Sequence, residues 1–325
     1  MAESFHLPSP FAPQPWPEPD VGFVVDALRV WRQFLIPFAK QARHIVQTVA
    51  TALRPLEQAL DLHRCTTSRR VAAAKRPGFI AAMSILLRWP DLQQPMDLVS
   101  GYHIVGEFAP TGLVRPVQSS TTSAPSLDTW LGDDAEQAIN RIVTSPPPRF
   151  AEEIFEITRG EQAKDFCGPF FTKAEVDETH GVGAWRPMER FLVRQADGKT
   201  RAIDNCRRTG HNRATLLHET ITTVNIDAIA TFGRMVCDAL ELCEAPGSSC
   251  SWLDMRVGTD DLPDAYRGLP VADDQLRFSY VAIFLPDTGW RFTPMYGLAY
   301  GLDFPGRSRS RTSCSLVSSF HSARH

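Results

Sequence analysis

The sequence predicts an α+β fold, and three observations support this prediction. Apolar residues recur at three- and four-residue spacing from Phe23 to Leu60, as in amphipathic helices. Apolar and polar side chains alternate on both sides of Asp197-Gly198, which predicts a β-hairpin. Apolar segments also flank a Pro-Asp-Thr-Gly turn at 286–289, which predicts a second hairpin. We therefore expect a helical N-terminal region followed by a sheet-forming region.

The composition is that of an ordinary globular protein, with 43% hydrophobic and 22% charged residues. A chain of 325 residues is long enough for two domains. The seven cysteines form no Cys-x-x-Cys pair and are odd in number, which indicates reduced thiols in an intracellular protein. No apolar run reaches the roughly 18 residues of a membrane span, and residues 1–20 lack the features of a signal peptide. We expect a protein of the cytoplasm or nucleus that has no membrane partner.

Proline-rich stretches mark two predicted boundaries in the chain. Residues 1–20 are predicted to be an extended, disordered leader. Ser145-Pro146-Pro147-Pro148 is predicted to be a linker between domains. The region between these boundaries, 21–148, is predicted to be helical, and its role is unknown.

Helices are predicted at four places in this region, because apolar residues recur there with helical spacing. Pro37 is expected to kink or end the first helix, and Trp89-Pro90 is expected to end the third. Asp133 and Asp134 are expected to lie in the middle of the fourth as surface acids. The predicted ranges are 23–38, 45–60, 79–87 and 127–143.

Three more helices are predicted beyond the linker. The first covers 150–163. Thr172 to Glu175 forms a capping box, which predicts a short helix that ends at Gly181. Asn225 is expected to cap a third helix over 226–242.

The predicted hairpin at 189–204 carries two cations on its second strand. Asp197-Gly198 is typical of a two-residue type I′ turn. Because side chains alternate along a strand, Lys199 and Arg201 should lie on one face. Such a pair could clamp a triphosphate, since Arg binds phosphate oxygens through two parallel hydrogen bonds. The alternative is a basic hairpin that only decorates the surface.

The charge distribution is more informative than the net charge of −3. From Arg186 to Arg213 the chain carries eight basic and three acidic residues, a net charge of +5. From Ala214 to Gln275 it carries eleven acids and three arginines, a net charge of −8. A basic block followed by an acidic block suits a site that binds phosphates on one side and metals on the other. Two solvated faces of opposite sign are the alternative.

The acidic block contains the stretch 260–270, in which Asp261 and Asp264 are followed by Tyr266. A carboxylate at a strand end can hold Mg²⁺, which prefers hard oxygen ligands. The alternative is a helix start, with Asp261 as its cap and Pro263 in its first turn.

The sequence from Asp261 to Tyr266 resembles the first catalytic motif of reverse transcriptases, Asp-x-x-Asp-Ala-Tyr/Phe. The resemblance implies that Asp261 is a catalytic residue and a ligand of Mg²⁺, or of Mn²⁺ in its place. It implies that Asp264 lies near the triphosphate of an incoming nucleotide. It also implies that Tyr266 is the gate that excludes a ribose 2′-hydroxyl group.

The basic hairpin and the residues after it resemble the fingers motif of the same family, Lys-x-Arg-x-x-Asp-x-x-Arg-x-x-x-x-Asn. By this resemblance Lys199 and Arg201 hold the phosphates of the nucleotide. Further residues would brace the loop, namely Asp204, Arg207 or Arg208, and Asn212. His211 and His218 are expected to be structural or exposed rather than metal ligands.

The stretch 295–302 resembles the second palm motif, and its Tyr300 and Gly301 would contact the nucleotide. The resemblance covers about 150–302, and the order of the three motifs is more specific than any one of them. It implies a fingers-like region at 149–250 and a partial palm at 251–325 with an antiparallel sheet and an irregular C-terminal tail.

The implied parent activity is templated DNA synthesis from an RNA or DNA template-primer and deoxynucleotides, by two-metal nucleotidyl transfer. The family's Asp-Asp motif should follow Leu302, and it does not occur before His325. We therefore expect a truncated chain that does not polymerise alone. The alternatives are a non-catalytic RNA- or DNA-binding remnant of a retroelement and a degenerate product without function.

Overall fold

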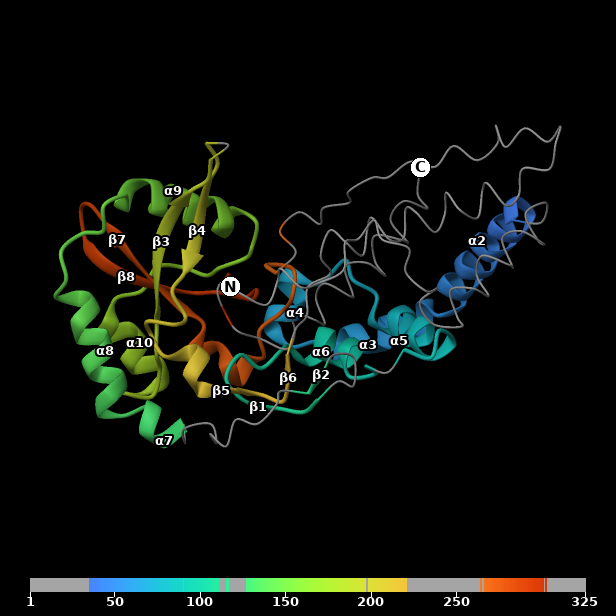
Figure 1. The fold of residues 1–325 in the computed structure, drawn as a ribbon, viewed down its shortest axis with the longest axis horizontal. Coiled ribbons are helices and arrows are strands. Elements are labelled where there is room, and N and C mark those ends of the chain that lie inside the picture. Colours follow the sequence, from blue (N-terminus) through green and yellow to red (C-terminus); the bar gives the residue numbers. More distant parts are fainter. Residues whose placement is uncertain are drawn as a thin grey trace, which may run out of the picture. The chain divides into compact units, whose positions relative to one another are not determined.

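The fold of the chain is seen in a computed structural model (Figure 1). The chain divides into two compact units. The described part of the first unit is the helix α2 (Leu35–Ala52) up to Thr51. All other described residues belong to a second unit. The structure describes residues 35–89, 91–110, 115–116, 127–196, 198–220, 264, 266–300 and 302.

The described part of the N-terminal region is mainly helical, as the sequence predicts. Residues 23–34 of the first predicted helix lie outside the described residues. Helix α2 contains Pro37 and continues to Ala52, so no helix ends at Pro37, and the alternative of a kink there stays a prediction. Glu57 caps the start of α5, because its carboxylate accepts hydrogen bonds from the backbone N–H groups of Gly78 (3.2 Å) and Phe79 (2.7 Å). The helices that follow α2 are α3 (Arg54–Leu62), α4 (Thr66–Val71), α5 (Pro77–Leu86) and α6 (Gln94–Ser100).

The predicted helix over 127–143 is in fact two helices, α7 (Leu127–Trp130) and α8 (Asp133–Val143). Gly132 breaks the run with a φ of 61°, a conformation that Gly adopts at little cost. Asp133 and Asp134 therefore lie in the first turn of α8 and not in the middle of a helix. Asp134 is an ion-pair partner of Arg186, with Oδ2 and Nη1 2.5 Å apart.

Two helices beyond the proline-rich stretch confirm the sequence-based predictions. They are α9 (Ala151–Ala163) and α10 (Lys173–His180). The capping box is present, since the Thr172 hydroxyl accepts from the Glu175 N–H (3.3 Å) and the Glu175 carboxylate accepts from the Thr172 N–H (2.7 Å). Gly181 ends α10 with a φ of 94°.

Both predicted hairpins form, and they join in one four-stranded sheet of order β4-β3-β7-β8. Strands β3 (Met188–Arg194) and β4 (Thr200–Asp204) are antiparallel, as are β7 (Tyr280–Leu285) and β8 (Gly289–Pro294). Strands β3 and β7 are parallel, with Met188 opposite Val281. The sheet is therefore mixed, whereas an antiparallel sheet with β7 and β8 beside the catalytic strand was expected. The expected catalytic strand, at whose end Asp261 would lie, is outside the described residues.

The turn of the first hairpin differs from the predicted type I′ turn. The Gly198 N–H donates to the Gln195 carbonyl (3.0 Å), and the Gln195 N–H donates to the Lys199 carbonyl (2.8 Å). These bonds enclose a three-residue loop, in which Gly198 has a φ of 81°. Such loops place Gly in the left-handed region after a turn, so the Asp-Gly pair marks the hairpin correctly but not its loop length.

The two faces of the sheet pack against different helices (Figure 1). Along β7, Val281 and Ile283 belong to a cluster that includes Ile154 of α9. The alternate residues Tyr280 and Ala282 belong to a cluster with α8 and α10. Strand β7 is apolar at every position because it lies inside the sheet and is covered on both faces.

The proline-rich stretch Ser145–Pro148 connects α8 on one face of this sheet to α9 on the other. Its Ser145 carbonyl accepts a hydrogen bond from the Trp290 indole (3.1 Å). The stretch therefore lies inside the second unit, where it crosses between two layers, and does not separate two units. The predicted leader at 1–20 and the predicted helix at 226–242 lie outside the described residues.

Short elements connect the sheet to the helical region. Their bounds are β1 (Gly106–Phe108), β2 (Arg115–Pro116), β5 (Thr215–Leu217), β6 (Glu219–Thr220) and the 3₁₀ helices His211–Ala214 and Asp273–Phe278. Strands β1 and β5 pair in parallel, and β2 and β6 pair antiparallel. The chain after the basic hairpin thus returns to the segment that follows α6.

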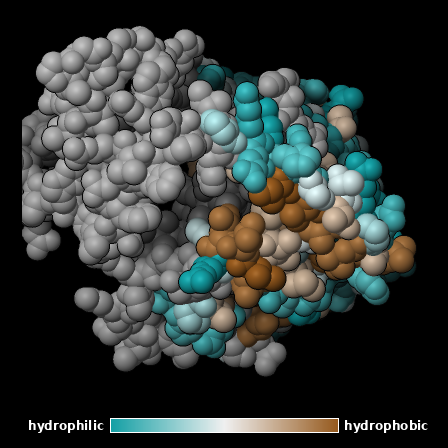
Figure 2. Space-filling view, turned by 90° about the vertical axis from the view of Figure 1, so that its right-hand side faces the viewer, coloured by the Kyte–Doolittle hydropathy of each residue, from teal (hydrophilic) through white to brown (hydrophobic). Residues whose placement is uncertain are grey.

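Apolar residues also gather on the surface that Figure 2 faces, on the side where α3 and α5 lie in Figure 1. At the end of α5, Ile85, Leu86 and Leu87 are 67%, 65% and 55% exposed.

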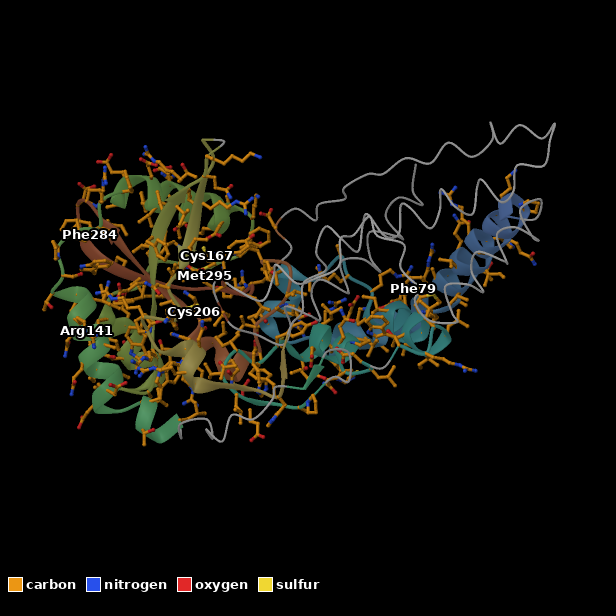
Figure 3. All side chains as sticks on the ribbon, viewed as in Figure 1. Phe79, Arg141, Cys167, Cys206, Phe284 and Met295 are labelled. Carbon is orange, nitrogen blue, oxygen red and sulfur yellow. The ribbon has the colours of Figure 1, made fainter. Side chains whose placement is uncertain are left out.

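In the interior, Cys167 lies beside Met295 (Figure 3), and the three described cysteines, Cys65, Cys167 and Cys206, are free thiols. Among the described helices, none combines the length and the apolar character that crossing a bilayer requires.

Candidate functional site

Three segments that lie far apart in the sequence meet at one place in the second unit. These are the end of β4, the turn at 264–269, and the segment 295–302. The Asp204 N–H donates to the Tyr300 carbonyl (3.0 Å), and the Leu298 N–H donates to the Tyr266 carbonyl (3.2 Å). The rings of Tyr266 and Tyr300 pack edge to face, with centroids 5.4 Å apart.

The close approach of two of these segments depends on Gly297. A Cβ atom at this position would lie 2.1 Å from the carbonyl oxygen of Arg267. Only Gly fits there, because it has no side chain. The described residues 264 and 266–268 form a turn, so this part of the acidic stretch is not the helix start that was considered as an alternative.

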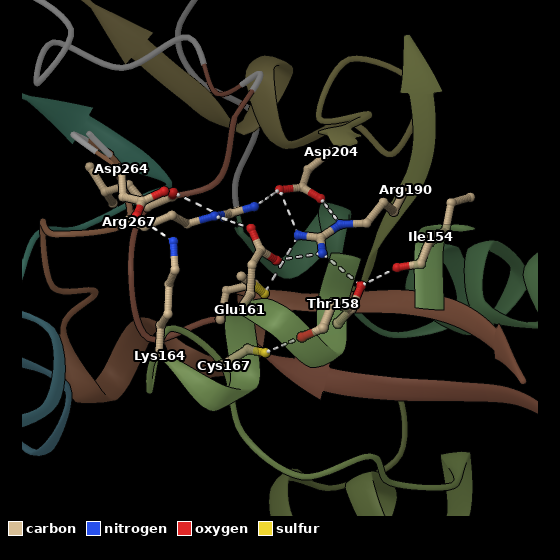
Figure 4. A network of polar contacts seen from close by, with 11 residues as sticks. Ile154, Thr158, Glu161, Lys164, Cys167, Arg190, Asp204, Asp264 and Arg267 are labelled. Atoms are coloured by element: carbon tan, nitrogen blue, oxygen red, sulfur yellow. Dashed lines mark hydrogen bonds and ion pairs between the residues drawn. The ribbon is translucent and has the colours of Figure 1, made fainter. Parts of the chain in front are cut away.

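A closed ring of four charged side chains joins the segments (Figure 4). The Asp204 carboxylate accepts from Arg190 Nε (2.8 Å) and from Arg267 Nη2 (3.1 Å). The Glu161 carboxylate accepts from Arg190 Nη1 (2.6 Å) and from Arg267 Nε (2.8 Å). Each acid thus bridges both arginines, and each arginine bridges both acids. The four residues come from α9, β3, β4 and the 264–269 turn.

Further contacts fix this ring in the core. Arg190 also donates to the Thr158 hydroxyl (2.9 Å), and Arg267 donates to the Leu298 carbonyl (3.1 Å). The Arg267 guanidinium lies 4.8 Å from the centre of the Tyr300 ring, which is a cation–π distance. The side chains of Arg190 and Asp204 are fully buried, and that of Arg267 is 1% exposed.

Burial and charge act in opposite directions on the ring. Burial alone would raise the pKa of Asp204, but the guanidinium groups of Arg190 and Arg267 outweigh it and hold this pKa below its usual value. Burial would lower the pKa of Arg190, and the two carboxylates raise it instead. Both shifts favour the charged forms of Asp204 and Arg190, and the ring combines two arginines with two carboxylates. Nearby, burial raises the pKa of the Cys167 thiol to about 11, so this thiol stays protonated.

The turn at 264–269 is bound to α9 at a second point. Lys164, the residue after the last turn of α9, donates to Asp264 Oδ2 (2.8 Å). Asp264 has a φ of 55°, which is uncommon for a residue with a side chain. Burial raises the pKa of the Tyr300 hydroxyl, and Arg267, Asp264, Glu161 and Arg201 also act on this pKa. Tyr300 therefore lies among the charged groups of all these segments.

The predicted phosphate-binding cations lie outside the ring. Lys199 and Arg201 are exposed. Arg201 lies on the face of β4 opposite to the buried Ala202 and Asp204, and Lys199 lies two residues earlier, just before β4 begins. The exposure pattern agrees with the predicted shared face. Arg201 is paired across the strands with Val193.

The other predicted brace residues have different partners. Asp204 belongs to the ring, whereas Arg207 is exposed and Arg208 forms an ion pair with Glu189 (3.1 Å). The backbone N–H of Asn212 donates to the Cys206 carbonyl (3.2 Å). The structure thus brings Asp204 together with Asp264, Tyr266 and Tyr300, while Arg207, Arg208 and Asn212 lie along the chain beyond the ring.

The predicted metal ligand Asp261 and the predicted contact residue Gly301 lie outside the described residues. Among the residues that are described, no group of three or more His, Cys, Asp or Glu side chains could hold a metal ion. Asp264 is bound to Lys164, and the carboxylates of Asp204 and Glu161 are used by the two arginines. The expectation of Mg²⁺ or Mn²⁺ therefore depends on Asp261.

The two histidines have the surroundings that the sequence analysis expects. His211 is buried, with Nδ1 2.8 Å from the Thr209 hydroxyl and Nε2 2.9 Å from the Phe278 carbonyl. Burial lowers its pKa to about 3, so the ring is neutral in the core. His218 is on the surface beside Glu107.

The sequence analysis missed three members of the ring, Glu161, Arg190 and Arg267. Two of them had a usable signal. Arg190 and the inward-facing Leu192 are two residues apart on β3, so their side chains lie on the same face. A charged residue on the buried face of a strand is the signal. Arg267 directly follows Tyr266 in the acidic motif. Glu161 has no local signal, because an acid near the end of a helix is ordinary.

A cavity of about 470 Å³ lies at the base of the basic hairpin, next to the outward face of β3. It combines two aromatic rings, Phe191 and Trp290, with the cations Arg141 and Arg208. Phe191 is 41% exposed, which is unusual for so large an apolar side chain. The remaining lining residues are Ser145, Pro146, Pro147, Pro148, Glu189, Arg190 and Asn205.

Comparison of the chain with protein-family models, with curated proteins and with solved structures gives no match.

Proposed function

We propose that this chain is a reverse-transcriptase-like protein and that its described part contains the nucleotide-binding region. One observation supports this above all others. The three segments that resemble the fingers motif and the two palm motifs are far apart in the sequence, and they meet at Arg267 through Asp204, Tyr266 and Leu298. Unrelated surface motifs would have no reason to converge on one buried ring.

In this proposal, side chains of the hairpin and of the 264–269 turn bind a deoxynucleoside triphosphate. Lys199 and Arg201 would bind the phosphates, because both cations are exposed and lie two residues apart at the start of β4. Tyr266 would lie against the sugar. Its ring is held edge to face by Tyr300, and a fixed ring can exclude a 2′-hydroxyl group more effectively than a mobile one.

The parent reaction is templated nucleotidyl transfer with an RNA or DNA template-primer. Mg²⁺, or Mn²⁺ in its place, would stabilise the charge on the attacking and leaving oxygens in that reaction. Asp261 would be its ligand on this chain. The carboxylates of the ring and of Asp264 are bound by arginine and lysine, so we assign them no metal.

The test of nucleotide binding uses the full chain with dTTP and UTP in the presence of Mg²⁺, measured by calorimetry. We expect the chain to bind dTTP more tightly than UTP, and Tyr266→Val to bring the two affinities together. Circular dichroism of the variant serves as the folding control. Equal affinities of the unaltered chain for both nucleotides would contradict the role of Tyr266.

Catalysis is tested separately by primer extension with Mg²⁺ or Mn²⁺ and all four deoxynucleotides. Extension that is lost in Asp261→Ala would assign the catalytic role to Asp261. Nucleotide binding without extension would limit this chain to a binding function.

A second candidate function is supported by the cavity at the base of the hairpin. Exposed aromatic rings next to arginines are typical of proteins that bind single-stranded nucleic acid, since bases stack on the rings and phosphates bind the cations. The chain would then be a non-catalytic RNA- or DNA-binding protein. Phe191→Ala should weaken the binding of a labelled oligonucleotide and leave dTTP binding unchanged. Loss of oligonucleotide binding together with absent dTTP binding in the unaltered chain would favour this second function.

A further inference from the structure

We propose that the C-terminal end of α9 is a positioning device for the candidate nucleotide site, with Glu161 and Lys164 as positioning residues. Neither residue belongs to the motifs that suggested the site. The inference deepens the proposed function and rests on it for the identity of the ligand.

The residues at the end of α9 match those of the turn in spacing. Glu161 and Lys164 are three residues apart on one face of the end of α9, and they bind Arg267 and Asp264, which are also three residues apart. Glu161 Oε1 is 2.8 Å from Arg267 Nε, and Lys164 Nζ is 2.8 Å from Asp264 Oδ2. The turn is therefore held at two of its residues, Asp264 and Arg267, by the last turn of α9 and the residue that follows it.

The backbone of this turn has an uncommon conformation at Asp264. Asp264 has a positive φ of 55°, and such a conformation persists only where the surroundings determine it. The Gly268 N–H closes the turn on the Asp264 carbonyl (3.1 Å), and the Leu269 N–H donates to the Tyr266 carbonyl (3.1 Å). The ion pairs Glu161–Arg267 and Lys164–Asp264 hold the turn in this conformation. They thereby set the direction of Tyr266, which lies between Asp264 and Arg267 in the sequence.

Glu161 also links the turn to the hairpin. The second oxygen of Glu161 is 2.6 Å from Arg190 Nη1, and Arg190 in turn holds Asp204 at the end of β4. Hydrogen bonds between guanidinium and carboxylate groups are directional, so a closed ring of them specifies one relative placement of its members. Glu161 therefore couples the hairpin that carries Lys199 and Arg201 to the turn that carries Tyr266, in addition to the direct bond from Arg267 to Asp204.

These couplings determine one distance that matters for a ligand. Arg201 and Lys199 would bind the phosphate end of a nucleoside triphosphate, and Tyr266 would contact its sugar. A bound nucleotide needs both ends of the site at a matching separation, and a small misplacement costs binding. Glu161 would set this separation without touching the nucleotide.

The experiment compares Glu161→Gln with Glu156→Gln in the full chain. Glu156 is on the same helix, and its ion pair with Arg159 is exposed, so its variant removes a charge without touching the ring. The first measurement is hydrogen exchange of the amides of Gly268, Leu269 and Asp204. We expect at least a tenfold faster exchange of these amides in Glu161→Gln and no change in Glu156→Gln.

The second measurement is dTTP binding with Mg²⁺. Glu161→Gln should raise the Kd about tenfold, which corresponds to ~1.4 kcal/mol, and Glu156→Gln should not. Lys164→Gln provides a variant that folds in any case, because this side chain is 58% exposed. It should speed exchange at Gly268 and Leu269 and leave Asp204 unchanged, since Lys164 is not part of the ring.

The outcomes separate the two proposals. Exchange that is unchanged in Glu161→Gln, or that rises equally at all slow amides of the second unit, would overturn the positioning role. Local exchange changes together with weaker dTTP binding support it. If the unaltered chain binds no dTTP, the proposed function fails, and the exchange of the three amides still decides whether Glu161 positions the turn.

Discussion

Arg190 and Arg201 lie on paired strands of the same hairpin, and their surroundings differ completely. Arg190 is fully buried and is bound by Asp204 and Glu161. Arg201 is exposed on the outward face of β4. In the sequence both belong to one basic block, 186–213, with a net charge of +5. The structure divides this block into cations that hold the fold together and cations that face solvent.

The same division applies to the ends of the block. Arg186 is buried and donates to the carbonyls of Thr209 and Trp130, both at 2.7 Å. Arg207 and Arg213 are exposed. A count of charges along the chain therefore overestimates the cations that a nucleic acid or nucleotide could reach. Side chains alternate between the two faces of a strand, so the face on which a cation lies is the better guide to whether a ligand can reach it.

The largest expected effect follows from the burial of Arg190. Arg190→Met leaves Asp204 and Glu161 with one arginine between them, and breaking a buried ion pair costs about 3–5 kcal/mol of the free energy of unfolding. Lys199→Met, at the exposed tip, should change this free energy by no more than about 0.5 kcal/mol. Urea denaturation of the two variants measures the difference. Equal losses would show that burial does not distinguish the two cations.

The two histidines extend the comparison between buried and exposed groups to pH. Because the folded-state pKa of His211 is lowered to about 3, the unfolded chain binds a proton between pH 6.5 and about 3 that the folded chain does not bind. Stability should therefore fall as the pH falls through this window, by about 2 kcal/mol between pH 7 and pH 5.

Urea denaturation of the unaltered chain, of His211→Gln and of His218→Gln at pH 7 and pH 5 tests this. His211→Gln should lack the loss. His218→Gln retains His211 and should show it, and it is a fair control because its ring is 42% exposed. The same loss in all three chains would mean that His211 does not cause it.

The exposed half of the block should control binding. The double variant Lys199→Ala/Arg201→Ala should weaken the binding of a labelled oligonucleotide about tenfold at low salt, or ~1.4 kcal/mol. The slope of log affinity against log salt should fall by about 2, one for each lost phosphate contact. Fluorescence anisotropy over a salt series measures both quantities.

The matched control removes two charges on the other side of the hairpin. Arg149 and Arg194 both lie against the Phe150 ring, at 5.0 and 4.6 Å from its centre. Arg149→Ala/Arg194→Ala should retain most of the affinity. If both double variants lose the same affinity, the binding reflects net charge and not the outward face of β4.

The smallest expected effect concerns two glycines at which a methyl group meets no neighbouring atom. Gly198 has a φ of 81° at the hairpin loop, so Gly198→Ala should destabilise the protein by about 1 kcal/mol through backbone strain. Gly160 is in the interior of α9, and Gly160→Ala should stabilise it by about 0.5–1 kcal/mol. Thermal denaturation should move in opposite directions. Destabilisation by both variants would contradict the expectation that Ala stabilises the helix at position 160 of α9.

Local patterns in the sequence were sufficient to predict most elements of the second unit. The capping box at Thr172 and Glu175 predicts α10, and the alternation around Asp197-Gly198 predicts both strands and the shared face of Lys199 and Arg201. Gly132 shows the limit of periodicity, because its positive φ divides an apparently continuous helix. These features depend on residues within a few positions of one another, so the sequence contains the information directly.

Only the tertiary structure decided which of these elements meet. The pairing of Met188 with Val281 joins two hairpins that are separated by many residues, and no local pattern specifies it. The ring of Glu161, Arg190, Asp204 and Arg267 likewise takes its members from four elements. The sequence gives Glu161 no local signal, and nothing in it shows that these four charges meet. Their role depends on burial, because only the loss of water makes charge balance and directional hydrogen bonds decisive for where these segments lie.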